Sequence, residues 1–327
     1  MSTLLISIIT PVYNGMPYLE ECIKSVLSQE NPYWELLISD DSSTDGSRDF
    51  LNSLNDSRIR IFKQEKNLGI FGNLNFLFQR TKAPISQILC QDDYFINSQS
   101  IDYILDYWNH VSEDIGYVRF NHCYKAKYLE VFQQKILPST IMSHDADLFF
   151  YVFGNIPGNL SNISLRTTLV HDCGGFNQDF PYAGDFEFWI RAAQMNNIGI
   201  SKQHTTYIRR HAGAASISFN QNGELVSQKR IIVNSLFNRL KIKYPQNYFL
   251  LKIVGTLNYD TLQRDAGIRQ WIHTKRNKYI KEVIYGKDDF SFSEFINWIL
   301  YVASVGGRIG RVGSAKYLLK VLLKNKL

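Results

Sequence analysis

Glu35-Leu-Leu-Ile-Ser39 is followed directly by Asp40-Asp41-Ser-Ser-Thr-Asp-Gly46. The first part is a short apolar run of the kind that forms a buried parallel strand. The second part is a polar turn whose Asp and Ser side chains can cap a following helix. The stretch therefore predicts a strand, a loop and a helix in direct succession, which is the repeating unit of an α/β fold.

The same unit occurs on both sides of this stretch. Residues 5–9 form an apolar, β-branched run that stops at Thr10-Pro11, and a helical stripe follows it. That stripe consists of Leu19, Cys22, Ile23, Val26 and Leu27. Further along, residues 58–62 alternate like an edge strand, Leu74, Leu77 and Phe78 mark a helix, and residues 87–90 form another buried strand. Three such units in succession predict a mostly parallel central sheet flanked by helices.

Polar clusters follow three of these strands at equivalent points of the repeating unit, at residues 10–14, 40–45 and 92–93. Right-handed crossovers place the carboxyl ends of parallel strands along one edge of the sheet. Open α/β sheets bind ligands in the crevice at that edge. We therefore expect the three clusters to converge on one ligand site.

The pattern changes after about residue 115. Residues 117–120 predict a strand, residues 154–164 a loop, Gly174-Gly175 a turn and residues 186–193 a helix. From about residue 227 onward the sequence predicts helices. We expect an α/β domain over residues 1–220 and a mostly helical C-terminal region over residues 221–327.

The cysteines and the first ten residues indicate the cellular compartment in which the protein works. The four cysteines, which form no CxxC pair, are Cys22, Cys90, Cys123 and Cys173. Their neighbours are apolar, which favours buried free thiols. Residues 1–10 do not read as a signal peptide, because no basic region precedes a long apolar stretch. These features predict a cytoplasmic protein.

The basic charge is concentrated at the C-terminal end. Residues 272–327 contain eleven Lys and Arg and four Asp and Glu, a net charge of +7, whereas the whole chain carries +6. Tyr317, Leu318, Val321 and Leu322 form an apolar stripe among lysines. A basic amphipathic helix of this kind can lie on an anionic membrane, so residues 295–327 predict a peripheral contact with the inner membrane face. The alternative is a helix that packs on its own domain with a solvated lysine face.

Asp92-Asp93 follows a strand that is expected to end at the ligand edge. Two adjacent carboxylates there repel each other unless a cation or a proton lies between them. Hard oxygen ligands favour Mg²⁺ or Mn²⁺, and Mg²⁺ is often held by one or two carboxylates plus substrate phosphates. The pair predicts a metal site, and an ordinary Asp-rich turn is the alternative.

Two further clusters carry groups suited to proton transfer and phosphate binding. Asp185 and Glu187 lie at the expected start of a helix, where either could act as a general base or simply interact with the helix dipole. Arg191 follows Glu187 by four residues, so an ion pair within the helix is also open. Arg209 and His211 could hold a diphosphate or complete a metal site, or belong to a basic surface loop.

These motifs, in this order, resemble the family 2 glycosyltransferases of the GT-A fold over residues 5–216. The segments that carry the resemblance are Ile9-Thr-Pro11-Val-Tyr13-Asn14, Ser25-Val-Leu-Ser-Gln29, Ile38-Ser-Asp40-Asp41-Ser-Ser-Thr-Asp45-Gly46-Ser47, Asn67-Leu-Gly69, Leu89-Cys90-Gln91-Asp92-Asp93, Gly174-Gly175-Phe176, Asp185, Arg209 and His211.

Two positions depart from the family's pattern. Cys90 stands where the first Asp of the usual DxDD element would be, and a thiol is a poor ligand for Mg²⁺. Asp92 is then expected to be the chief metal ligand, helped by His211 and the diphosphate. Gly184-Asp185 replaces the usual Glu-Asp pair, so the matching base is Asp185, with Glu187 as the second candidate.

The resemblance implies an inverting transfer of a sugar from a UDP, dTDP or GDP donor to a hydroxyl of a glycan or lipid-linked glycan, in cell-surface polysaccharide biosynthesis. It implies Mg²⁺ or Mn²⁺ as the cofactor. Its expected site residues are, for catalysis, Asp185 and Glu187; for the nucleotide, Pro11, Tyr13, Asn14, Asp40, Asp41, Asn67, Gly69 and Arg209; and for the metal, Asp92, Asp93 and His211.

Three rival functions can be compared with this one. A silent nucleotide-sugar-binding scaffold of the same fold stays open, because fold alone does not fix activity. A sugar-nucleotide pyrophosphorylase would need a glycine-rich basic loop near the start, which residues 11–15 lack. A nucleic-acid partner is not expected, because the predicted site is acidic and the basic tail has no recognised motif.

Overall fold

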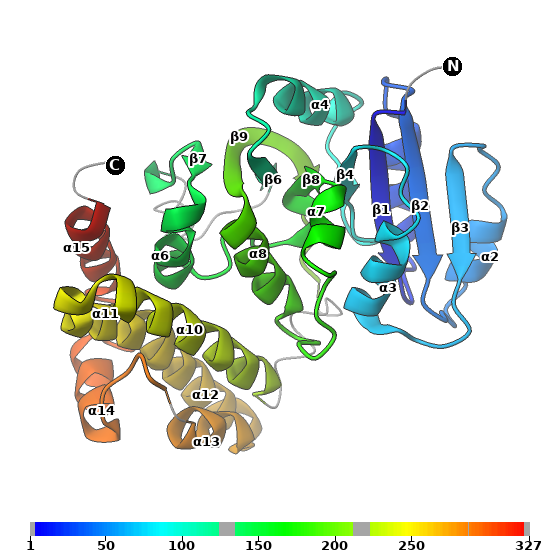
Figure 1. Cartoon of the computed structure of the whole chain (residues 1–327). Coiled ribbons are helices and arrows are strands. Elements are labelled where there is room, and N and C mark those ends of the chain that lie inside the picture. The colour runs from blue at the N-terminus through cyan, green and yellow to red at the C-terminus, as the bar shows by residue number, and fades with distance from the viewer. Residues whose placement is uncertain (1–3, 124–134, 212–222, 287, 324–327) are drawn as a thin grey trace. The chain divides into compact units, whose positions relative to one another are not determined.

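The computed structural model describes residues 4–123, 135–211, 223–286 and 288–323 (Figure 1). Contacts divide the chain into two compact units. Unit 1 comprises Met1–Lys125, Ser139–Ser143 and Pro157–Arg210, and unit 2 comprises Ala126–Pro138, His144–Ile156 and His211–Leu327. Residues 144–156 thus group with the C-terminal part of the chain, which differs from a simple division near residue 220.

Unit 1 contains one mixed sheet, and its first half is parallel as expected. The strands run in the order β3 (Ile59–Lys63), β2 (Trp34–Asp40), β1 (Ile6–Val12) and β4 (Ile85–Ile88). All three neighbouring pairs are parallel, and Val12 of β1 lies opposite Asp40 of β2. The carboxyl ends of these strands therefore meet at one edge, which confirms the central structural expectation.

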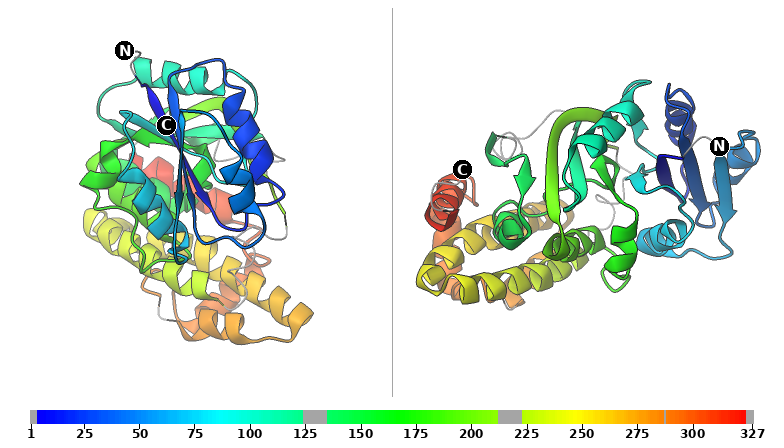
Figure 2. Two further views of the ribbon diagram at one scale, coloured as in Figure 1. Left: turned by 90° about the vertical axis from the view of Figure 1, so that its right-hand side faces the viewer. Right: turned by 45° about the horizontal axis from the view of Figure 1, so that its top comes forward.

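Helices cover both faces of this parallel half, as Figures 1 and 2 show. On one face α1 (Leu19–Leu27), α2 (Ser47–Asn52) and α4 (Ser100–His110) share a core cluster with the even-numbered residues of β1 and β2. On the other face α3 (Gly69–Phe78) packs against β1 and β2. The alternation follows from the two-residue period of a strand. The predicted stripe of α1 is buried except for Leu27.

The second half of the sheet is mostly antiparallel and was only partly predicted. Strand β8 (Ile163–Arg166) is antiparallel to both β4 and β6 (Ile115–Cys123), and β9 (Asn197–Tyr207) pairs with β6, β5 (Tyr94–Phe95) and β7 (Thr140–Ile141). The expected loop at 154–164 holds a 3₁₀ turn at Leu160–Asn162 and the start of β8. Two short helical segments complete the unit, α7 (Thr168–Asp172) and α8 (Gly184–Met195).

Unit 2 is helical in its described residues, as the sequence predicts. Its elements are α6 (Ser143–Phe153), α10 (Glu224–Lys243), a 3₁₀ turn at Pro245–Asn247, α11 (Tyr248–Gly255), a π-helical turn at Thr256–Asp260, α12 (Thr261–Thr274), α13 (Lys278–Tyr285), α14 (Glu294–Ala303) and α15 (Arg311–Leu323). Leu318, Leu319 and Leu323 of α15 are buried, which fits the alternative of a helix packed on its own domain. In the described part of the chain, no helix combines the length and hydropathy needed to cross a bilayer.

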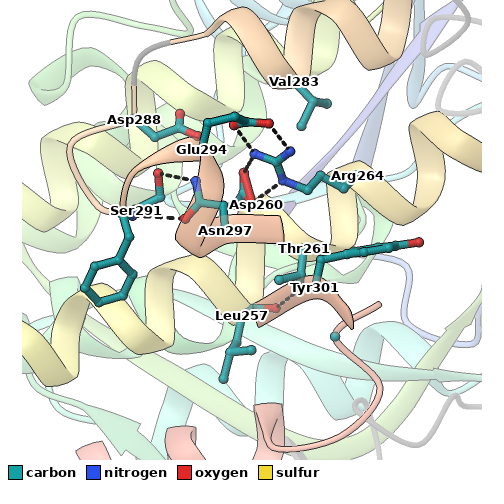
Figure 3. Close-up of polar contacts among 12 residues, drawn as sticks. Leu257, Asp260, Thr261, Arg264, Val283, Asp288, Ser291, Glu294, Asn297 and Tyr301 are labelled. Atoms are coloured by element: carbon teal, nitrogen blue, oxygen red, sulfur yellow. Dashed lines mark hydrogen bonds and ion pairs between the residues drawn. The ribbon is translucent and has the colours of Figure 1, made fainter. Parts of the chain in front are cut away.

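A buried arginine joins α12 to α14 in unit 2 (Figure 3). The guanidinium of Arg264, which is 1% exposed, donates to both carboxylate oxygens of Asp260 at 2.6 and 3.0 Å. It also donates to both oxygens of Glu294 at 2.5 and 2.6 Å. Burial raises the pKa of Asp260, and the Arg264 charge opposes that shift. Arg264 therefore provides both the hydrogen bonds and the positive charge that compensate for burying the Asp260 carboxylate.

Replacing Arg264 with Met should lower the free energy of unfolding of unit 2 by about 3 kcal/mol, because it leaves a buried carboxylate without its cation. Arg269→Met is the matched control, since Arg269 pairs with Asp265 at 2.7 Å on the same helix but is 59% exposed. An exposed pair of this kind contributes less than about 1 kcal/mol. Urea unfolding followed by circular dichroism measures both changes, and equal effects of the two variants would contradict the assignment.

Candidate functional site

The loops after β1 and β2 are tied together at the carboxyl edge of the sheet. The backbone N–H of Asn14 donates to Ser43 Oγ at 2.8 Å, and the Asn14 amide oxygen accepts from the N–H of Thr44 at 2.8 Å. Asn14 has a φ of 48°, a left-handed conformation that Asn adopts more readily than most residues. The N–H of Gly15 donates to Ser47 Oγ at 2.9 Å. The polar clusters at residues 10–14 and 40–45 are therefore joined by these hydrogen bonds.

The loop after β4 is joined to these clusters through Gln91. Its amide oxygen accepts from the N–H of Tyr13 at 2.7 Å, and its amide nitrogen donates to the carbonyl of Tyr13 at 2.9 Å. A Cβ at Gly15 would lie 2.8 Å from the Gln91 amide oxygen, so a larger residue there would displace the Gln91 side chain. Gln91 was not predicted as a site residue. It fixes the backbone that leads into Asp92.

Asp40 makes its bonds inside the protein. Its side chain is buried, and its Oδ2 accepts from Arg48 Nε at 2.5 Å. Its Oδ1 accepts from the N–H of Ser43 at 3.3 Å. The carboxylate therefore shapes the turn that carries Ser43 and Asp41.

Asp41 links that turn to the start of α3. Its Oδ1 accepts from the N–H of Leu68 at 2.7 Å, and its carbonyl accepts from the Asn67 side chain at 3.4 Å. Burial raises the pKa of Asp41, and the backbone N–H groups that face it act in the opposite direction. Gly69 has a φ of 72°, which explains the glycine at the end of the Asn67-Leu-Gly69 turn. Asp41, Asn67 and Gly69 are thus brought together, as predicted.

The adjacent carboxylates Asp92 and Asp93 have different environments. Asp93 is buried, with one oxygen accepting from Ser161 Oγ at 2.6 Å and the other from the N–H of Arg209 at 2.9 Å. Burial and the neighbouring Asp92 charge raise the pKa of Asp93 to about 7. Asp92 is partly exposed, and its carbonyl accepts from Arg209 Nε at 3.0 Å. Asp92 is therefore the outer carboxylate of the pair, and Asp93 is the inner one, whose hydrogen bonds hold the loop in place.

Arg209 lies against the loop that carries Asp92 and Asp93. Its guanidinium pairs with Glu21 of α1 and lies 4.5 Å from the ring centroid of Tyr18. The ring of Tyr94 lies 5.5 Å from the same guanidinium carbon. Contacts to a carboxylate and to aromatic faces hold an arginine in one orientation. Arg209 is thus a fixed cation next to Asp92.

Ser161 is a second residue that sequence reasoning missed. Besides donating to Asp93, its hydroxyl oxygen accepts from the N–H of Cys90 at 2.9 Å. Burial and the nearby carboxylates raise the pKa of Cys90 well above that of an ordinary thiol. The thiolate form is therefore disfavoured at this position, and a thiol is in any case a poor ligand for Mg²⁺.

The start of α8 carries the two candidate bases. Glu187 pairs with Arg191 through two hydrogen bonds, at 2.9 and 2.8 Å. The alternative ion pair within the helix therefore forms. Arg191 also donates to the carbonyls of Cys173 and, at 2.9 Å, Gly175. Asp185 lies in the first turn of α8, and its Oδ1 accepts from the N–H of Phe186 at 2.8 Å.

Helix α8 packs directly on α3, the helix that starts beside Asp41. A Cβ at Gly184 would lie 2.7 Å from the ring of Phe71 in α3. The side chain of Asn75 in α3 forms two hydrogen bonds with the backbone of Phe176, at 2.8 and 2.7 Å. The ring of Phe176 stacks on Phe188 of α8 with centroids 4.1 Å apart. Asp185 is thus connected to Asp41 through α3.

The donor set at Asp92 suits a hard divalent cation that shares its ligands with a substrate. Among the described residues, no group of three His, Cys, Asp or Glu side chains could hold a metal ion. One partly exposed carboxylate next to a buried one fits Mg²⁺ or Mn²⁺ completed by phosphate oxygens and water. His211, the third predicted ligand, falls in unit 2 by contacts. Its part in a metal site stays a prediction.

Solved structures that match this chain include complexes with nucleotide-sugars. A crystal structure of S. aureus TarS 1-349 in complex with UDP-GlcNAc matches with a TM-score of 0.61 and 16% identity, over 97% of this chain and 92% of that chain. The mannosyltransferase PcManGT from Pyrobaculum calidifontis, in complex with GDP-Man and Mn²⁺, matches with a TM-score of 0.54 and 13% identity, over 99% of this chain and 81% of that one. The sheet with flanking helices is therefore the GT-A fold.

Relatives by sequence are bacterial glycosyltransferases. WfgD of Escherichia coli, a UDP-Glc:alpha-D-GlcNAc-diphosphoundecaprenol beta-1,3-glucosyltransferase, is 27% identical over 77% of this chain and 95% of its own length. WfaP of Escherichia coli, named for the same reaction, is 26% identical over 70% of this chain and 85% of its own length. A segment of 91 residues is 41% identical to the teichuronic acid biosynthesis glycosyltransferase TuaG of Bacillus subtilis, and it covers 36% of that protein.

The family model for glycosyl transferase family 2 matches residues 7–177, more than half of the chain. This segment contains the joined loops at the sheet edge, from Pro11 to the Gly174-Gly175-Phe176 turn. Asp185 and Arg209 follow it. The chain is a glycosyltransferase that belongs to glycosyl transferase family 2.

Proposed function

We propose that the chain transfers a sugar, with inversion, from a nucleoside diphosphate to a hydroxyl of a lipid-linked glycan during cell-surface polysaccharide assembly. The observation that carries this proposal is the joining of three separate polar loops at one sheet edge by side-chain hydrogen bonds. The names of WfaP and WfgD support a diphosphoundecaprenol-linked acceptor, and the TarS complex supports a UDP-sugar donor.

The nucleoside would bind where the loops after β1 and β2 meet the Asn67-Leu-Gly69 turn. Tyr13 is 50% exposed there, so its ring is available to stack on a base. Asp41 orders the turn through Leu68 and would read the base or ribose, while Asp40 positions the loop from inside. Pro11 and Asn14 would shape the floor of this subsite.

The diphosphate would lie beside Asp92 and Arg209. A Mg²⁺ or Mn²⁺ held by Asp92 would supply charge neutralisation for the leaving diphosphate. Arg209, already fixed by Glu21 and Tyr18, would add a cation on the same side, and Asp93 would hold the loop in place.

The acceptor hydroxyl would be activated by Asp185. A general base must be ionised before it can accept a proton from an acceptor hydroxyl, and the helix dipole favours the ionised form of a carboxylate in the first turn. Glu187 is committed to Arg191, which holds the glycine turn through two carbonyls, and is therefore the weaker candidate. Alignment and electrostatics would supply most of the rate enhancement.

A donor screen tests this function. The protein is mixed with Mn²⁺ and a panel of UDP-, dTDP- and GDP-sugars, with and without a diphospholipid-linked sugar acceptor, and released nucleotide is measured. We expect one donor to be turned over, faster with the acceptor present. Thermal stabilisation by a nucleotide with no turnover of any donor would instead support a silent binding protein.

Gln91→Ala should raise the KM for the donor about tenfold with little change in kcat. The variant removes two hydrogen bonds that join the first and third loops, each contributing about 0.5–1.5 kcal/mol. Gln91→Glu can still accept from the N–H of Tyr13 but cannot donate to its carbonyl, so an intermediate KM is expected. Steady-state kinetics at varied donor concentration measures both variants, and an unchanged KM in Gln91→Ala would contradict this role.

The proposed place of action is the inner membrane face, reached through residues 295–327. A lipid-linked acceptor requires the enzyme to work close to a bilayer. The basic excess of this segment supports attraction to anionic lipids.

A further inference from the structure

The polar residues of helix α14 form hydrogen bonds or ion pairs with other residues of unit 2 (Figure 3). Glu294 is held by the buried Arg264, and Asn297, which is 3% exposed, donates to Ser291 Oγ at 3.3 Å. The hydroxyl of Tyr301 donates to a carboxylate of α12 at 3.4 Å. These contacts fix the rotation of the helix about its axis. A surface helix normally shows the opposite pattern, with its apolar side buried.

The outward side of α14 is apolar. Phe295, Ile299 and Val302 follow an i, i+4, i+7 spacing and are 75%, 50% and 72% exposed. The exposed apolar residues that continue this surface are Ile296 on the helix and Val305 and Ile309 in the loop after it. We call these six residues the α14 face. Single exposed apolar residues are common, but a contiguous group on one side of a helix marks an interaction surface.

The exposed charge within the α14 face is positive. Between residues 290 and 323 the only acid in the sequence is Glu294, and it is paired with Arg264. Arg308 is exposed between Val305 and Ile309, whereas Asp265 of α12, which contacts Tyr301, is paired with Arg269. Cations beside an apolar surface complement anionic lipid headgroups. A second copy of the chain would instead bring the same cations to the contact.

We propose that the α14 face docks into the headgroup and upper acyl region of an anionic bilayer. The ten residues of α14 span about 15 Å, half of the hydrocarbon thickness, so the helix would lie in the plane of the membrane rather than cross it. The inference deepens the proposed function, because a lipid-linked acceptor places the enzyme at such a surface. It also moves the contact from the α15 stripe, whose Leu318 is buried, to residues 295–309.

Vesicle co-sedimentation of the full chain tests this inference. The lipids are phosphatidylglycerol with phosphatidylcholine, and phosphatidylcholine alone. We expect binding to the anionic vesicles and at least a tenfold lower partition coefficient for the triple variant Phe295→Ser/Ile299→Ser/Val302→Ser. Arg308→Gln should lower it about fivefold, since one cation near an anionic surface contributes about 1 kcal/mol.

The matched control is the triple variant Ile231→Ser/Ile242→Ser/Tyr285→Ser, which removes apolar residues that are 58%, 78% and 78% exposed on other helices of unit 2. It should bind vesicles like the natural chain. Equal partition of the two triple variants, or no vesicle binding together with a dimer that only the α14 variant dissociates in sedimentation analysis, would overturn the inference.

Turnover of the nucleotide-sugar in vesicle-free solution separates the inference from the function on which it rests. The natural chain and the α14 triple variant should release nucleotide at the same rate there. Vesicle binding without any turnover would defeat the proposed function and leave the docking surface standing. Turnover without vesicle binding would support the proposed function and defeat the proposed docking of the α14 face.

Discussion

Asp185→Asn is expected to lower kcat about 10³–10⁴-fold while the affinity for the donor stays within about threefold. The variant keeps the size of the side chain and its bond to the N–H of Phe186, but an amide cannot accept the acceptor's proton. A correctly placed general base contributes up to about 10⁴-fold in rate. Single-turnover kinetics with saturating acceptor measures the chemical step directly.

Glu187→Gln is the control for this prediction. Glu187 forms two hydrogen bonds with Arg191, so its loss should loosen the Gly174-Gly175 turn and lower activity only several-fold. A large loss in Glu187→Gln together with retained activity in Asp185→Asn would move the base to Glu187.

Asp92→Asn is expected to lower kcat about 10³-fold and to weaken the dependence of the rate on Mn²⁺. The variant removes the charge of the one partly exposed carboxylate that follows β4, and stabilisation of charge on a leaving group is usually worth about 10²–10³-fold or more. Rates measured over a Mn²⁺ titration separate weaker metal binding from a lower maximum.

Glu21→Gln is the matched control, because Glu21 contacts the same arginine as the Asp92 loop but is not proposed to touch the cation. Its rate should stay within about threefold of the natural chain. If Asp92→Asn kept the full rate and Mn²⁺ response, the metal site would have to lie elsewhere.

The parallel half of the fold could be predicted because its strands are buried on both faces and its helices show clear stripes. Cys22, Ile23 and Val26 were expected on one side of a helix, and all three are buried there. Strand β9 was missed because its middle, residues 200–204, is partly or fully exposed and polar, so neither alternation nor an apolar run marks it. Burial from tertiary contacts decides such a segment.

The candidate site was predictable in its acidic residues and not in the residues that hold them. Asp41 and Asp92 follow predicted parallel strands, and the order of those strands brings their loops to one edge. Arg209 follows β9, which the sequence did not predict. Gln91 and Ser161 act through contacts 78 and 68 residues away in sequence, which no local pattern encodes. Asp93 belongs to the predicted pair, but its burial and its bond to Ser161 became visible only in the folded chain.

In the C-terminal region, sequence periodicity also failed to identify which side of a helix is buried. In the predicted apolar stripe of α15, Leu318 is buried whereas Tyr317 is 61% exposed, so the stripe does not lie wholly at the surface. Helix α14 is apolar around much of its circumference, so periodicity could not tell which side faces inward. The ion pair between the buried Arg264 and the partly exposed Glu294 decides it, by fixing which side of the helix faces the rest of unit 2.

A crystal structure with UDP and Mn²⁺, with anomalous data collected at the manganese edge, tests the central claim most directly. The account predicts one manganese peak between the Asp92 carboxylate and the diphosphate, with the uracil beside Tyr13 and Asp41. A nucleotide bound away from the carboxyl edge of β1 and β2, or a manganese ion that does not contact Asp92, would contradict it.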